Sequence, residues 1–182
     1  MSNRLFALIG VLPLLPSVAQ AGMSVGDPVP LRFASSPDLV ITGGTLSITD
    51  IHVNRCNGVV DHYEVDLDFD VVEQDTLLIP SGDVCGIDLD LDGPLVVTGH
   101  HAQHSGTFTL TLQVGVVHVN VAPVLHVENN QSDADWVEIA NPNWVTGGML
   151  GLDAGEQITV SAPSTLHNQI RDRVRNQSSV VR

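Results

Sequence analysis

Strict alternation of apolar and polar residues recurs in short runs along this chain. Residues 65–70 read Val-Asp-Leu-Asp-Phe-Asp, and residues 87–92 read Ile-Asp-Leu-Asp-Leu-Asp. Residues 107–114 alternate again, with Phe108 and Leu110 among the apolar members. A period of two places every apolar side chain on one face of a β-strand, whereas a helix would scatter them. The pattern therefore predicts strands with one buried face.

Turn-forming residues separate these runs. Asn57-Gly58 is a strong hairpin signal, and residues 80–83 and Gly93-Pro94 also interrupt the alternation. Its phase slips after Ile48, which predicts a bulge near Thr49-Asp50. Many short strands at close spacing are typical of an antiparallel β-sandwich, immunoglobulin-like or jelly-roll-like, with a barrel as the alternative. We therefore expect an all-β fold, with the sandwich as the preferred architecture.

The last segment departs from this pattern. Leu166, Ile170 and Val174 are spaced four residues apart, which places them on one face of a helix. Ser164 is a suitable N-cap, and arginines at 171, 173 and 175 lie where the helix dipole favours positive charge. We therefore expect a short amphipathic helix over residues 164–176 that packs on the sheet. A loose tail over residues 178–182 is expected to follow it.

The N-terminal residues have the three parts of a secretory signal. Arg4 is the only charged residue among the first 26, an apolar run follows from Leu5 to Leu15, and Ala19 and Ala21 form an A-x-A ending. The run is too short to span a bilayer, and no later stretch approaches that length. We therefore expect residues 1–21 to be removed on export. Residues 22–182 would then form one periplasmic or extracellular domain without a transmembrane segment.

Carboxylates dominate the charge of the chain. There are 21 Asp and Glu residues against 7 basic residues, all of them arginine, for a formal net charge of −14. Most of the arginines lie near the C-terminus, so the body of the chain is strongly acidic. A field of that sign repels nucleic acid and attracts cations or a cationic protein partner. An acidic surface that only keeps the protein soluble is the alternative interpretation.

Two cysteines, Cys56 and Cys85, each lie beside turn residues. Outside the cytoplasm such a pair favours a disulfide. A two-cysteine metal site is less favoured, because the chain has no C-x-x-C spacing. We therefore predict a Cys56–Cys85 bridge that holds two strands together.

Two aspartate ladders are the first candidates for cation binding. In the alternating runs, each triplet of aspartates lies on one strand face, about 7 Å between successive members. Like charges on neighbouring strands repel, and Ca²⁺ would relieve that repulsion through hard oxygen ligands. Residues 88–93 resemble the opening of an EF-hand loop, but the twelfth position is Gly99 instead of Glu, which excludes an EF-hand. A solvated acidic face is the alternative. The candidate ligands are Asp66, Asp68, Asp70, Asp88, Asp90 and Asp92.

A histidine-rich loop is the second candidate. Three imidazoles fall within residues 100–104, in a segment where glycines on both sides predict a hairpin loop. Neutral imidazole suits Zn²⁺ or Cu²⁺. An ordinary polar loop is the alternative. The candidate ligands are His100, His101 and His104, with His118 or His126 as a fourth.

No catalytic motif accompanies these candidates. The sequence has no G-x-S-x-G, no H-E-x-x-H and no phosphate-binding glycine loop. His52 and His62 lie in predicted strands and are interpreted as packing or surface residues, and Trp136 and Trp144 as core residues. We therefore expect an exported acidic β protein with a non-enzymatic binding or surface-structural role, compatible with cation binding. The alternative is a transition-metal-dependent hydrolase or a metal-handling periplasmic protein that uses residues 100–104.

Overall fold

The computed structural model describes residues 26–128, 131–152 and 156–182. The predicted export signal, residues 1–21, lies outside these described residues. Strands make up most of the described chain, which confirms the all-β prediction. The strands are β1 (Asp27–Phe33), β2 (Leu39–Arg55), β3 (Val60–Asp70), β4 (Gln74–Ile79), β5 (Gly82–His101), β6 (Thr107–Leu112), β7 (Val116–Glu128), β8 (Gln131–Ser132), β9 (Trp136–Ile139), β10 (Gln157–Val160) and β11 (Ser178–Val181). The two helices are α1 (Gly147–Leu150) and α2 (Thr165–Asn176).

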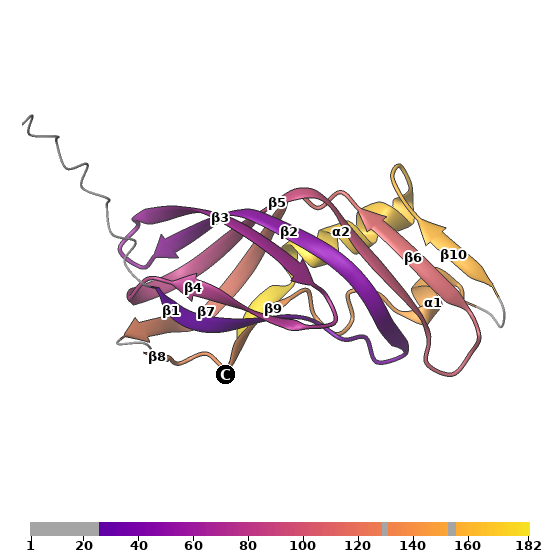
Figure 1. Cartoon of the computed structure of the whole chain (residues 1–182), viewed down its shortest axis with the longest axis horizontal. Helices are drawn as coiled ribbons and strands as arrows, with labels where there is room; N and C mark the ends of the chain where they lie inside the picture. Colours follow the sequence, from indigo (N-terminus) through magenta and orange to yellow (C-terminus); the bar gives the residue numbers. More distant parts are fainter. Residues whose placement is uncertain (1–25, 129–130, 153–155) are drawn as a thin grey trace, which may run out of the picture.

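The strands form one continuous sheet built around the long strand β5 (Figure 1). On one side β5 pairs with β2 along nearly its whole length, and on the other its first half pairs with β7 and its second half with β6. The sheet continues from β7 through β11, β9 and β1 to β4, while β3 lies beyond β2. It therefore curves around a core until β3 and β4 come into contact, nearly closed into a barrel. The finer prediction of a two-sheet sandwich stays a prediction.

The alternating residues divide between the core and the surface as expected. Ile87 and Leu89 of β5 are fully buried, and so is Val117 of β7. The phase slip after Ile48 corresponds to a register shift of β2 against both β3 and β5, between Ile48 and Asp50. This bulge keeps apolar residues inward on both sides of it.

The predicted disulfide is confirmed. Cys56 and Cys85 are bonded, with an S–S distance of 2.07 Å and 5.0 Å between their Cα atoms. Cys56 follows the end of β2, and Cys85 lies in β5 where the register shifts between Val84 and Gly86. The bridge therefore holds together the last pairs of the β2–β5 ladder.

The predicted C-terminal helix is present as α2. The Ser164 side chain caps it by accepting the His167 N–H, and Ile170 and Val174 are buried on its inner face. The helix packs on β6 and β7. No helix in the described ranges is long and apolar enough to cross a membrane.

The prediction of a loose tail after the helix is wrong. Residues 178–181 form β11, which pairs in parallel with β7 and antiparallel with β9. The buried Ser178 hydroxyl donates to the Val174 carbonyl and accepts the Ala140 N–H, and Val180 is also buried. A four-residue strand is too short for alternation to reveal it, and its place in the sheet depends on partners far away in the sequence.

Candidate cation-binding face

The outer surface of β3, β2, β5 and β7 carries histidines beside aspartates. The strand register places one row of four polar side chains across these strands, and the row reads His62, His52, Asp88 and His118. In the neighbouring row Asp50 lies opposite Asp90. We use the name His–Asp face for the surface formed by His52, His62, His118, Asp50, Asp88 and Asp90.

Each histidine of the His–Asp face is hydrogen-bonded to an aspartate. The distances from ring nitrogen to carboxylate oxygen are 2.6 Å for His62–Asp50, 3.1 Å for His52–Asp90 and 2.7 Å for His118–Asp88. An ionised carboxylate can only accept a hydrogen bond, so the imidazole nitrogen is the donor in each pair. In a neutral imidazole this fixes the tautomer and leaves the other ring nitrogen as an acceptor. That acceptor is Nδ1 in His52 and His62.

The rings of His52 and His62 are stacked. Their centroids are 4.7 Å apart and their planes differ by 5°. The two residues are direct cross-strand neighbours on β2 and β3. Their side chains are 32% and 50% exposed, so solutes in solvent can reach both. Two imidazole acceptors therefore lie in adjacent, accessible rings whose orientation is set by carboxylates.

The hydrogen bond from His62 holds the pKa of Asp50 below its ordinary value. Replacing His62 with alanine is expected to raise that pKa, because the main group that stabilises the carboxylate is lost. The pH dependence has a definite sign. A pKa lowered by folding contributes stability above the ordinary aspartate pKa, and this stability is lost as the pH falls through the lowered value.

A carbon-detected NMR titration of the Asp50 carboxyl group would measure this shift. The matched control is His126→Ala, which removes a similar pair with Asp83, 2.7 Å apart, at another place on the surface. The control should leave the Asp50 midpoint unchanged. An unchanged Asp50 midpoint in His62→Ala would contradict the prediction.

The aspartate ladders point outward, as expected, but they do not lie on adjacent strands. One ladder belongs to β3 and the other to β5, with β2 between them. Ser47 of β2 is opposite both Asp68 and Asp92, and its hydroxyl donates to Asp68 at 2.6 Å. The strand spacing places the ladders roughly 10 Å apart. Calcium binding by these aspartates stays a prediction.

The histidine-rich segment forms the end of β5 and the β5–β6 loop. The rings of His101 and His104 are in contact, with centroids 4.4 Å apart, whereas a ring nitrogen of His100 lies 2.9 Å from the His101 carbonyl oxygen. His118 pairs with Asp88, roughly 40 Å from His100 along an extended strand. The loop histidines therefore lie far from His118, and His126 pairs with Asp83 at a third place on the surface. Metal binding by the loop stays a prediction.

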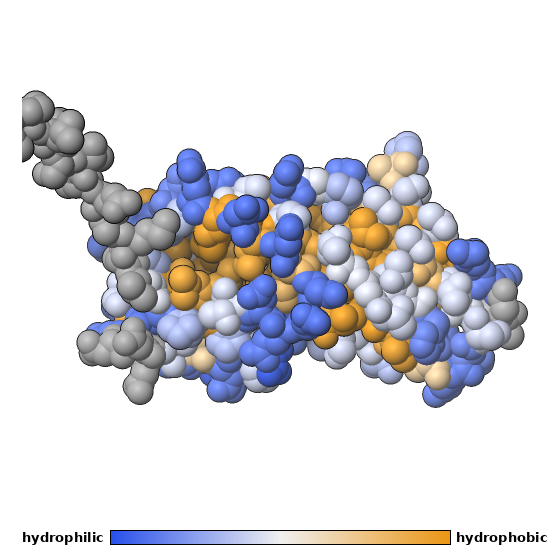
Figure 2. Space-filling model, in the orientation of Figure 1, coloured by the Kyte–Doolittle hydropathy of each residue, from blue (hydrophilic) through white to orange (hydrophobic). Residues whose placement is uncertain are grey.

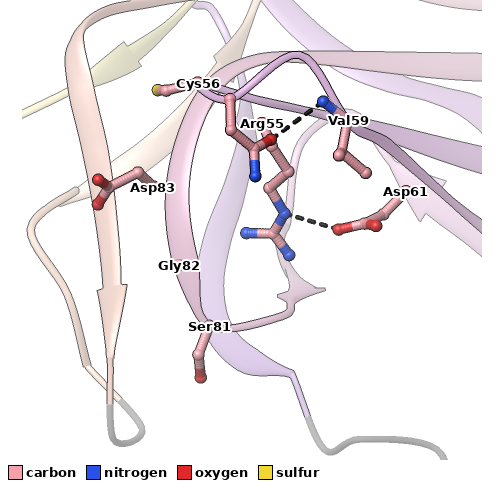
Figure 3. A pocket seen from close by; sticks show the side chains of 8 residues that line it. Arg55, Cys56, Val59, Asp61, Ser81, Gly82 and Asp83 are labelled. Carbon is pink, nitrogen blue, oxygen red and sulfur yellow. Dashed lines mark hydrogen bonds and ion pairs between the residues drawn. The ribbon is translucent and has the colours of Figure 1, made fainter.

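A cavity of about 650 Å³ opens at the disulfide end of the sheet. Figure 3 shows the Arg55 guanidinium turned toward Asp61, with Nε 2.6 Å from the carboxylate. Its Nη1 donates to the Pro80 carbonyl oxygen at 3.1 Å. Arg55 thus connects the start of β3 with the end of β4, a role that its position in the sequence does not indicate. The lining residues are Arg55, Cys56, Asn57, Val59, Asp61, Ser81, Gly82 and Asp83.

Among the described residues, no group of three or more His, Cys, Asp and Glu side chains is arranged to hold a metal ion. The His–Asp face therefore offers a pair of oriented imidazoles and no preformed three-residue centre. His52 and His62, which the sequence indicates as packing or surface residues, both lie on the outer, polar side of their strands. That parity, combined with the Asn57-Gly58 hairpin between them, could have indicated that they are neighbours.

No family model, curated protein or solved structure matches this chain.

Proposed function

We propose that this protein works outside the cytoplasm as a non-enzymatic binding protein, and that its His–Asp face binds Zn²⁺ or Cu²⁺. The stacked pair of His52 and His62 carries this proposal, because each ring has its Nε2 hydrogen-bonded to a carboxylate. Histidine metal ligands commonly donate their second ring N–H to a carboxylate, which orients the ring and raises its basicity. The proposed ligands are therefore the two Nδ1 atoms, with Asp50 and Asp90 as orienting groups.

A shared ion sets the distance that the two Nδ1 atoms must reach. Zinc–nitrogen bonds are about 2.0–2.1 Å long, so two ligating nitrogens lie roughly 3.3–4.2 Å apart. The stacked ring centroids are 4.7 Å apart and the ring planes differ by 5°. The exposed rings must therefore turn out of the stack until the Nδ1 lone pairs, which lie in the ring planes, converge on the ion. Water would complete the coordination shell. The acidic field of the protein raises the local concentration of cations and supports binding at such an exposed site.

Replacing both His52 and His62 with alanine is expected to abolish binding of Zn²⁺ and Cu²⁺, because both nitrogen ligands are lost. Isothermal titration of the purified protein with each metal salt would measure the stoichiometry. The matched control is the double variant His101→Ala, His104→Ala, which removes the two loop imidazoles that are in contact and leaves the His–Asp face intact. The control should bind as the unchanged protein does.

The opposite pattern would overturn the proposal. If the loop variant loses the metal and the His52, His62 variant retains it, the site is the loop. A metal-handling or hydrolytic role for residues 100–104 would then replace the function proposed here.

Thermal unfolding with Ca²⁺, compared with a monovalent salt of matched ionic strength, tests calcium binding by the aspartate ladders separately. A specific rise in melting temperature would indicate a calcium site.

A further inference from the structure

The sheet leaves two edge strands side by side. Within the described chain, β3 pairs with β2 alone and β4 with β1 alone. Residues 71–73 connect the two strands, which are in contact although no strand pairing joins them in the described ranges. Each strand therefore has backbone N–H and C=O groups along one side that a further strand can pair with. We call the boundary between these two unpaired edges the β3–β4 seam.

The inner face of β3 is incompletely covered at this seam. Tyr63, Val65 and Leu67 point toward the core but are only partly buried. The inner residues of β4, Leu77 and Ile79, are at most 1% exposed. Figure 2 shows apolar surface between the polar side chains in the region of β3 and β4. The apolar side chains of an added strand would complete this cover.

The outer face of the same edge strand is acidic. Glu64, Asp66, Asp68 and Asp70 alternate with the inner residues, and all four are exposed. Of the ion pairs among the described residues, none involves any of these four carboxylates. Side chains directly opposite on a paired strand have Cβ atoms about 4.5–5.5 Å away. Lysine or arginine at alternate positions of an added strand would therefore be attracted, and acidic residues would be repelled.

Arg55 and the cavity mark one end of the seam. The arginine bonds to Asp61 at the start of β3 and to the Pro80 carbonyl just after β4, so a side chain connects the edges where backbone pairing is absent. The Arg55 guanidinium forms its ion pair with Asp61. The four exposed carboxylates further along β3 are not hydrogen-bonded to Arg55 and are accessible to a partner.

We infer that the β3–β4 seam binds an extended segment of a partner protein in which Lys or Arg alternates with apolar residues, as a strand added along β3. Backbone hydrogen bonds to β3 supply affinity, and the alternation supplies specificity. The apolar residues cover Tyr63, Val65 and Leu67, while the basic residues face the four carboxylates. A second copy of this chain fits poorly, because the polar positions of its alternating runs are aspartates in residues 65–70 and 87–92 and threonine or glutamine in residues 107–114, with no Lys or Arg. The inference does not depend on metal binding, since none of the four carboxylates belongs to the His–Asp face.

A synthetic peptide of alternating lysine and valine tests this inference. The control peptide has the same composition with its lysines and valines in separate blocks, so it keeps the charge and loses the match to the two faces of β3. Fluorescence anisotropy should show that the alternating peptide binds about tenfold more tightly or better. Its affinity should fall as salt rises, because the paired charges are exposed. Equal binding of both peptides, or no binding of the alternating one, would overturn the inference.

Two protein variants locate the binding surface. The triple variant Glu64→Gln, Asp66→Asn, Asp68→Asn removes three charges from β3 and is expected to weaken binding of the alternating peptide about tenfold. The matched control Asp135→Asn, Glu156→Gln, Asp172→Asn removes three exposed charges elsewhere and should leave binding unchanged. Equal weakening by both variants would show only general attraction to an acidic protein. Thermal unfolding of both variants confirms that they are folded.

Amide hydrogen exchange supplies an independent readout of strand addition. The bound peptide should slow exchange in β3, whose open edge gains hydrogen bonds. β10 is an internal control, since it is also at the end of the sheet, pairs with β6 and carries no charged residue. Protection at β10 as well, or no protection at β3, would contradict the proposed position of the peptide.

Discussion

Replacing Trp144 with alanine is expected to destabilise the fold by about 3–5 kcal/mol. Trp144 lies in the loop that connects β9 to α1 and is fully buried. Its ring packs edge-on against Phe33, with centroids 5.1 Å apart. Its Nε1–H donates to the Ala34 carbonyl oxygen at 3.2 Å. The truncation leaves a cavity where the indole packed, and it removes the hydrogen bond of a buried carbonyl group. Both costs act in the folded state.

Urea unfolding followed by far-ultraviolet circular dichroism would measure this loss. Trp144→Phe is the matched control, because it also removes the N–H donor but fills most of the space that alanine would leave empty. It should lose less stability than alanine. Trp136→Ala should also cost less, since that ring is partly exposed beneath Arg32, whose guanidinium carbon lies 4.3 Å from the ring centroid. A Trp144→Ala midpoint equal to that of the unchanged protein would contradict the prediction.

Local pattern predicted the strands, because alternation within a strand is a property of neighbouring residues. The runs at residues 65–70 and 87–92 lie in β3 and β5, and the phase slip near Thr49-Asp50 is a register shift. Strand limits were predicted less well. Gly93-Pro94 was expected to interrupt a strand, yet β5 runs through it. The register with β2 shifts there, between Thr45 and Ser47, and such an irregularity tolerates a residue without an N–H.

The order of strands in the sheet could not be predicted from these patterns. The two aspartate ladders look equivalent in the sequence, yet β2 separates them, and Ser47 lies between Asp68 and Asp92. The His–Asp face depends on the same order, because His52 and His118 are the cross-strand neighbours of Asp88 on opposite sides of β5. Each histidine is unremarkable within its own strand. Only pairing between distant segments brings them to one surface.

Removing the disulfide by Cys56→Ala together with Cys85→Ala is expected to cost roughly 3–4 kcal/mol, because the unfolded chain regains the entropy of an open loop of about 30 residues. β3 and β4 lie wholly inside that loop. The paired residues of β2 and β5 continue far beyond the bridge, so the folded structure should persist with lower stability.

Urea unfolding of the double variant, beside the unchanged protein with and without reductant, would measure the cost. Reduction of the unchanged protein should lower its midpoint as the double variant does, while reductant should leave the double variant unchanged. Equal stability of all four samples would contradict the prediction.

Amide exchange should also show where the fold loosens. The end of the β2–β5 ladder beside Val84 should exchange faster, because the bridge no longer holds Cys56 beside β5. Arg55 bonds to Asp61 and to the Pro80 carbonyl next to this end, so loosening there should widen the seam between β3 and β4.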